Sequence, residues 1–463
     1  MASVTTSPLT CIPPLRDGAC GTTPRLQQPL WSVMRREMGQ TLGMMPTLFW
    51  ANYTMLFQTA SWAGIAETML RLVLACLEMG IMLAALPLWL MLPGAMFAMW
   101  LGACAGFILA MCWMLNGKEQ MYQCSAGSGS EGWMMGQEAE DEKWMFLGGM
   151  GMSSRHCHKH TLPTLSRLFG RSMVCICMPT YGMPFDTIAM MLQRCVPSQL
   201  RCAVLDDSMN RCVVLCHNDS AVIVSQAVAQ LCADVPMEKL RKLEIYTFGA
   251  AAAEFMMPLG DIKYHQPGEP PNEQRGIHLE HFAMKDDPFA QVGVLHSVRQ
   301  NMEGRFCGGV FLMNKDRNAA PTLQKSSRMA VSALSGLTME EYLIALFPAQ
   351  MMPSDCSSAS PRRSVLDSVM NIDKDCAEKR EIAAMSNYHS ASRAKKGGKR
   401  LSWTGLAAMA GHNKNGMGAG MVALEMARKG CRNCEGRRDR EVSWLARYVS
   451  AEERLAADRR PSP

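Results

Sequence analysis

Apolar runs alternate with amphipathic segments through the middle of the chain. The run Cys212–Cys216 is short, apolar and contains β-branched residues, as is typical of a strand that is covered on both faces. The following residues, 219–233, repeat their apolar positions with the period of a helix. Polar residues separate the two patterns. The sequence therefore predicts a buried strand, a sharp turn at 217–220 and a helix.

The same alternation continues on both sides of this turn. Further strands are predicted at 144–147, 172–177, 243–248, 278–284 and 306–313, and further helices at 162–169, 185–194 and 338–347. Strands that alternate with helices favour a mostly parallel sheet with helices on both faces. Residues 144–348 are therefore predicted to form one α/β domain.

A long apolar stretch precedes this domain. Between Leu72 and Leu115 only Glu78 is charged, and Pro93-Gly94 divides the stretch near its middle. Each half is about as long as the ~20 residues that a bilayer-spanning helix needs. A transmembrane helical hairpin is predicted over residues 72–115. A buried core hairpin, or one long helix kinked by proline, is the alternative interpretation.

The charges that flank the hairpin predict its orientation. Arg71 precedes it and Lys118 follows it, and lysine and arginine are enriched on the cytoplasmic side of membrane proteins. Both ends of the hairpin, and with them the α/β domain, are therefore expected in the cytoplasm. The predicted localisation is a multi-pass membrane protein, with the lipid bilayer as its partner.

Composition divides the rest of the chain. Residues 1–71 show no sustained period and are expected to be largely irregular, and residues 116–143 are expected to be a linker. Residues 349–463 are expected to form a basic tail, partly helical or disordered, with 18 Lys+Arg against 8 Asp+Glu from residue 379 onward. Such a tail is expected to be solvated or to touch anionic lipid. No recognised nucleic-acid fold accompanies it, so no nucleic-acid partner is predicted.

Several short phrases occur in a recognisable order. They are Pro179-Thr180, Phe185-Asp186, Gln193-Arg194, 243–249, 280–283 and 293–295. In this order they resemble a group of lipase/esterase-like α/β-hydrolase proteins known chiefly from fungi. The resemblance covers residues 144–348, a little under half of the chain. It implies an α/β-hydrolase-like fold behind the transmembrane hairpin.

The resemblance also implies where a catalytic triad would stand. It places the nucleophile at Asn218, the acid at Asp287 and the histidine at Leu337. A serine hydrolase needs an oxygen nucleophile and an imidazole that accepts its proton. Asn218 offers an amide and Leu337 cannot carry a proton, so we expect the fold without the catalysis. Asparagine tolerates the positive φ of such a turn better than most residues, so the turn itself can persist.

A displaced catalytic pair is the alternative at this turn. Ser220 supplies a hydroxyl there and His217 an imidazole. However, Ser220 lies two residues further into the helix, away from the expected oxyanion donors, the backbone N–H groups near Gly149 and Asp219. We expect Ser220 to satisfy backbone groups at the helix start instead.

Three interpretations of function follow from these residues. The first is an inactive hydrolase-like protein that binds an acyl or lipid-like molecule, or a protein partner. The second is an active serine esterase or lipase that uses displaced residues. The third is a decayed gene copy without a selected activity.

Other chemistry-bearing residues do not change this picture. The histidine-rich stretch 156–160 has no second ligand pair at zinc-finger spacing and is expected to be a solvated loop, and Cys431 and Cys434 stand alone. Residues 148–151 lack the Lys-Ser/Thr of a phosphate-binding loop. His281 and His296 are expected to be structural. No metal ion and no cofactor are predicted.

The 19 cysteines, odd in number and scattered, favour a reducing compartment.

Overall fold

The computed structural model describes the α/β body, the hairpin and a few short segments that join them. It describes residues 9–12, 35, 39, 43, 46, 62–116, 121–125, 141–149, 152, 154–180, 195–255, 277–301, 306–313, 338–351, 365–367, 371–373 and 443–449. The predicted helix at 185–194, Leu337 and the pair Cys431 and Cys434 lie outside these ranges.

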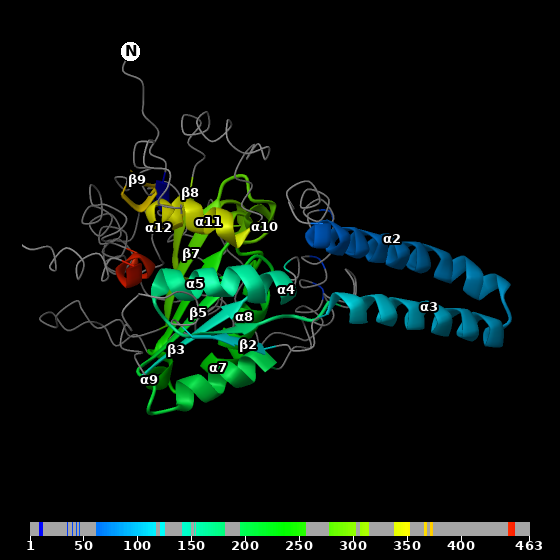
Figure 1. The fold of residues 1–463 in the computed structure, drawn as a ribbon, viewed down its shortest axis with the longest axis horizontal. Coiled ribbons are helices and arrows are strands. Elements are labelled where there is room, and N and C mark those ends of the chain that lie inside the picture. The colour runs from blue at the N-terminus through cyan, green and yellow to red at the C-terminus, as the bar shows by residue number, and fades with distance from the viewer. Residues whose placement is uncertain are drawn as a thin grey trace, which may run out of the picture.

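A nine-stranded sheet runs through the α/β body (Figure 1), with the strand order β2-β4-β3-β5-β6-β7-β8-β1-β9. The strands are β1 (Leu9–Ile12), β2 (Met121–Cys124), β3 (Glu142–Leu147), β4 (Met173–Ile176), β5 (Arg211–His217), β6 (Leu243–Phe248), β7 (His278–Met284), β8 (Gly309–Met313) and β9 (Asn371–Ile372). The strands from β4 to β8 in this order pair in parallel. Strand β2 is antiparallel to β4, and β1 is antiparallel to β8. The predicted α/β class with a mostly parallel sheet is confirmed.

Alternate residues of the central strands pack into two different cores. In β5, Cys212, Val214 and Cys216 belong to one core, and Val213 and Leu215 belong to the other. This division follows from the two-residue period of a strand, whose successive side chains point to opposite faces. The continuous apolar pattern of this strand is therefore explained by burial on both faces.

Helices cover both faces of the sheet (Figure 1). Helices α7 (Cys195–Leu205) and α8 (Ser220–Asp234) pack into the first core. Helices α5 (Leu162–Phe169) and α11 (Met339–Leu346) pack into the second. The shorter helices are α4 (Ser154–His156), α9 (Met237–Leu240), α10 (Pro288–Val292) and α12 (Pro348–Met351).

Two long helices, α2 (Trp62–Met91) and α3 (Gly94–Leu115), project together from one end of the body (Figure 1). Both are long and apolar enough to cross a membrane. The described chain exposes eighteen large hydrophobic side chains, and all but Met121 and Leu205 lie on these two helices. Only 17% and 11% of their most apolar windows are buried, so the two helices are not covered as a buried core hairpin would be. Helix α2 also begins earlier than the predicted Leu72.

The base of the hairpin is fixed to the body. Asn116, the C-cap of α3, donates a hydrogen bond from Nδ2 to the Thr180 carbonyl oxygen at 2.9 Å. It also accepts one at Oδ1 from the Thr180 N–H at 2.7 Å. Leu74 of α2 packs against Met111 and Leu115 of α3 at the same end. The hairpin is therefore tethered to the segment that follows β4.

Segments that were predicted to be irregular contribute to the body. Strand β1 lies in the N-terminal segment, β2 in the predicted linker and β9 in the tail. Residues 443–449 are not solvated as predicted: Leu445 is buried in the second core, and the Trp444 ring stacks on His278 with centroids 4.0 Å apart. Each of these segments is very short, and its partners lie far away in the sequence, so no local pattern marks it.

Candidate functional site

Asn218 forms the sharp turn between β5 and α8. It is the one non-glycine residue with a positive φ, 53°, in the described part of the chain. A left-handed conformation costs an ordinary L-residue about 1–2 kcal/mol, and asparagine tolerates it better than most. The backbone holds the turn in place, since the Asn218 N–H donates to Phe248 O at 2.8 Å and its carbonyl accepts from Ala251 N at 3.1 Å. The predicted strand–turn–helix arrangement is confirmed.

Three polar side chains converge over Gly249, which follows β6 and has a φ of 63°. A Cβ atom at Gly249 would overlap Asp287 Oδ2 and would lie 2.6 Å from Asn218 Oδ1 and 3.0 Å from Tyr342 Oη. The fold therefore brings Asn218 and Asp287 together, as the resemblance implies. Tyr342 was not predicted to be part of this group, because it lies on a helix far along the chain and no motif marks it.

Asp287 and Tyr342 form a buried hydrogen-bonded pair. The Tyr342 hydroxyl donates to Asp287 Oδ2 at 2.5 Å, and both residues are fully buried. Asp287 Oδ1 accepts from the Phe289 N–H at 2.8 Å and so caps α10. The Tyr342 oxygen in turn accepts from the Met284 N–H at 3.1 Å. A tyrosine hydroxyl thus binds the carboxyl group that the resemblance assigns to the triad acid.

Burial sets the protonation of two groups near this turn. It raises the pKa of Asp287 to about 8, although the Tyr342 hydroxyl and the backbone N–H groups of α10 oppose the shift. Burial also lowers the pKa of His217 to about 4. Near neutral pH, the His217 imidazole is therefore uncharged, and much of Asp287 carries a proton.

These two shifts predict how stability depends on pH. Between about pH 4 and 8 the folded chain holds a proton on Asp287 that the unfolded chain releases, so a rising pH favours unfolding. His217 has the opposite effect below its ordinary pKa of 6.5, which leaves Asp287 to dominate above that pH. In the wild type, the free energy of unfolding should therefore fall by up to about 1.4 kcal/mol for each pH unit between about pH 6.5 and 8. The Asp287→Asn variant should not show this fall.

The measurement is thermal or urea unfolding of the full chain in detergent from pH 6 to pH 9. Asn at position 287 keeps an oxygen that accepts from the Phe289 N–H and can donate from Nδ2 to the Tyr342 oxygen, so both proteins should fold. Parallel stability curves for the wild type and the Asp287→Asn variant across this range would contradict the assignment.

Ser220 is bound entirely by backbone groups. Its hydroxyl accepts from the His217 N–H at 3.0 Å and lies 3.0 Å from Leu147 O and 2.8 Å from His217 O. The residue is 1% exposed. These contacts agree with the structural role expected for Ser220, although its hydroxyl binds groups that precede α8 and not the N–H groups of the helix itself.

The His217 side chain does not pair with Ser220 in any described hydrogen bond. Its ring packs edge-on against Tyr342, with centroids 6.1 Å apart. Its Nε2 atom is buried and has no hydrogen-bond partner in the described part of the chain. The two residues of the displaced pair therefore contact each other only through the His217 backbone.

The loop after β3 passes directly over the turn. A Cβ atom at Gly149 would overlap Asp219 Oδ1 and would lie 3.0 Å from His217 O and 3.5 Å from Asn218 Cβ. Only a residue without a side chain allows this close approach. Gly149 and Asp219, the expected oxyanion positions, thus lie next to each other beside Asn218.

His281 is a core histidine, as predicted. Its Nδ1 atom lies 2.8 Å from Thr247 Oγ1 and its Nε2 atom 2.9 Å from Cys307 O, and it is 0% exposed. His296 is half-buried at the start of the π-helical segment His296–Asn301. Neither residue has a described hydrogen bond to Asp287.

The histidine-rich stretch differs from its prediction. It is helical rather than a loop, with α4 followed by the π-helical turn Cys157–Thr161. The three histidines are exposed, but Cys157 is 1% exposed and lies beside Cys175 and Cys177. The sequence held a signal for this cluster, because cysteines two residues apart on a strand share one face. A search for zinc-finger spacing does not find it.

No protein-family model matches the sequence, and no curated protein matches it. Function is therefore inferred from the residues and their geometry.

Proposed function

We propose that this chain is a membrane-anchored, α/β-hydrolase-like protein, related in architecture to lipases and esterases, that does not hydrolyse esters. The observation that carries the proposal is Asn218, which occupies a strained strand-to-helix turn beside Asp287. In α/β-hydrolases such a turn presents the nucleophilic serine. Here the turn presents an amide.

The arrangement around the turn supports the hydrolase-like assignment. The turn follows a central parallel strand, β5, and opens helix α8. A glycine loop after β3 lies against it, as the oxyanion loop does in α/β-hydrolases. An acid, Asp287, approaches from the segment after β7. These are three of the positions that a triad site uses.

The side chains at these positions support the absence of catalysis. The Ser220 hydroxyl is bound by backbone groups. The Asp287 carboxyl is bound by Tyr342, a phenol whose pKa is raised well above its usual value by burial. Such a phenol stays protonated near neutral pH and cannot serve as the general base that an imidazole provides. Among the described residues, the displaced pair therefore offers a Ser220 hydroxyl that is buried and a His217 imidazole that forms no hydrogen bond with it, which argues against the alternative of an active esterase.

A binding role then remains for the domain. We propose that it binds an acyl or lipid-like molecule, or a protein partner, at the membrane to which the hairpin attaches it. The hairpin would hold the domain next to the lipids of this membrane, and binding them requires no ester hydrolysis.

Ester turnover tests the inactive assignment. The purified full chain in detergent should hydrolyse p-nitrophenyl acetate, octanoate and palmitate no faster than the same protein after heat denaturation. Turnover that exceeds this control and disappears in Ser220→Ala would support the active alternative.

The hairpin supports membrane anchoring, with α2 and α3 as two spans and the body in the cytoplasm. The full chain should stay in the membrane pellet after carbonate extraction. Replacing Met79 and Leu83, which are 50% and 74% exposed near the middle of the apolar span Met69–Met91 of α2, with lysine should release it, since each charge near the bilayer centre costs about 2.5–3.5 kcal/mol. Leu205→Lys, at an exposed leucine of the body, is the matched control and should stay in the pellet.

A further inference from the structure

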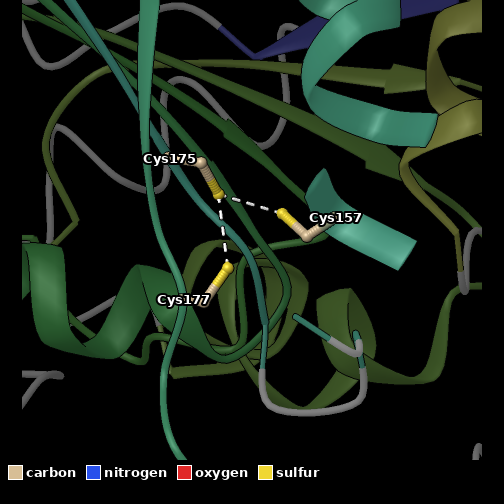
Figure 2. A group of neighbouring side chains, drawn as sticks. All are labelled: Cys157, Cys175 and Cys177. Carbon is tan, nitrogen blue, oxygen red and sulfur yellow. Dashed lines mark hydrogen bonds between the residues drawn. The ribbon is translucent and has the colours of Figure 1, made fainter. Parts of the chain in front are cut away.

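The thiols of Cys157, Cys175 and Cys177 point toward one another (Figure 2). Cys157 comes from the π-helical turn before α5, Cys175 from β4, and Cys177 from the residues just after β4. The sulfur atoms of Cys157 and Cys175 are 3.0 Å apart, and those of Cys175 and Cys177 are 3.5 Å apart. All three sulfur atoms lie within 4.8 Å of one another.

The cluster is enclosed by the protein. Cys157, Cys175 and Cys177 are 1%, 0% and 6% exposed and belong to the second core. Within the described part of the chain, it is the only group of three or more histidine, cysteine or acidic side chains placed to hold one ion.

The spacing of the sulfur atoms fits a metal ion between them. Zinc binds thiolates at about 2.3 Å in tetrahedral geometry, which separates neighbouring sulfur atoms by about 3.8 Å. The separations of 3.0 and 3.5 Å are shorter than this value, and the third sulfur–sulfur separation is within 4.8 Å, so shifts of up to about an ångström would complete the site. Soft thiolate ligands select ions such as Zn²⁺ and Cu⁺ over Mg²⁺ and Ca²⁺.

We propose that Cys157, Cys175 and Cys177 bind one thiophilic metal ion of the Zn²⁺ class. Each thiol loses its proton when the metal–sulfur bond forms, and no oxidation is involved. Three thiolates leave the fourth position of a tetrahedral ion open. This inference does not rest on the proposed function, because none of the three cysteines belongs to the Asn218 group.

The position of the ion suggests what it would do. A Cβ atom at Gly148 would lie 3.5 Å from Cys157 Sγ, and Gly148 precedes the glycine that covers the Asn218 turn. Cys177 lies three residues before Thr180, which holds the base of the hairpin through Asn116. An ion here would therefore fix both the loop over the turn and the junction between the body and the hairpin.

Metal titration of the full chain tests this site. The protein is purified in detergent under reducing conditions, stripped with a chelator, and titrated with Co²⁺ and then with Zn²⁺. The wild type is expected to bind about one ion per chain, to show sulfur-to-cobalt charge-transfer absorption, and to melt at a higher temperature with zinc. Zinc should displace the cobalt.

Cysteine variants distinguish metal binding at this cluster from metal binding at other cysteines. Cys175→Ala and, independently, Cys157→Ala should lose stoichiometric binding and the charge-transfer band. Cys212→Ala removes an equally buried strand cysteine outside the cluster and should bind like the wild type. Circular dichroism establishes which variants are folded, and the comparison uses those.

Two results would overturn the proposal. One is a reduced, folded wild type that binds neither Co²⁺, Zn²⁺ nor Cu⁺. The other is a folded Cys175→Ala or Cys157→Ala variant that binds as tightly as Cys212→Ala. A disulfide between Cys157 and Cys175, found by mass spectrometry together with a reduced form that binds no ion, would replace the metal site by a redox pair.

Discussion

Gly249→Ala is expected to lower the free energy of unfolding by about 3 kcal/mol or more. The φ of 63° costs an alanine about 1–2 kcal/mol. The new Cβ atom would also overlap Asp287 Oδ2 and crowd Asn218 Oδ1, and overpacking costs about 1–3 kcal/mol. Asp287 cannot easily move away, because it caps α10 and binds Tyr342.

Thermal or urea unfolding of the full chain in detergent measures this effect. Gly148→Ala is the matched control, since its Cβ atom would meet its nearest neighbour at an ordinary 3.4 Å. Equal stability of the two variants would show that the three polar groups do not converge at Gly249.

Ending the chain after Val442 is expected to cost several kcal/mol of stability. Residues 443–449 bury Leu445, Ala446 and Val449 in the second core, and truncating even one buried leucine to alanine costs about 2–5 kcal/mol. The buried Glu280 would also lose the bonds at 2.8 and 2.7 Å from Ser443 Oγ and Trp444 N.

A second carboxylate depends on the same segment. Tyr448 donates its hydroxyl to Glu244 Oε2 at 2.7 Å. The Tyr246 hydroxyl, at 2.8 Å, would still bind this oxygen, so the loss is that of one hydrogen bond, about 0.5–1.5 kcal/mol. A chain that ends after Ser450 keeps this segment and is the matched control. If both shortened chains unfold at the same temperature, residues 443–449 do not hold the sheet as described.

Local patterns predicted the central sheet well. Strands β6 and β7 have the predicted bounds, because each is a short run of strand-forming residues that ends at a turn. Helix α11 begins where predicted, because the Thr338 side chain accepts from the Glu341 N–H at 3.3 Å. The turn at Asn218 was predicted because the apolar period changes there from that of a strand to that of a helix.

Long-range contacts could not be predicted in this way. Strand β1 is only four residues long and pairs with β8, some 300 residues away, so its partner, not its own sequence, makes it a strand. Tyr342 joins the site only because α11 packs over β7, and the Cys157 thiol reaches Cys175 only because α5 covers β4. The sequence therefore predicts Asn218 and Asp287 as residues of the site. The positions of Tyr342 and of the Cys157 thiol become known only from the fold.

Fluorophosphonate labelling of the purified full chain most directly tests whether the Asn218 turn has lost its catalysis. The full chain is required because β1, β9 and residues 443–449, all outside 144–348, complete the sheet and its core. The folded protein is predicted to remain unlabelled at Ser220 and at every other serine, with an active serine esterase labelled in parallel. Labelling that requires the folded state and disappears in Ser220→Ala would contradict the account and make Ser220 a nucleophile.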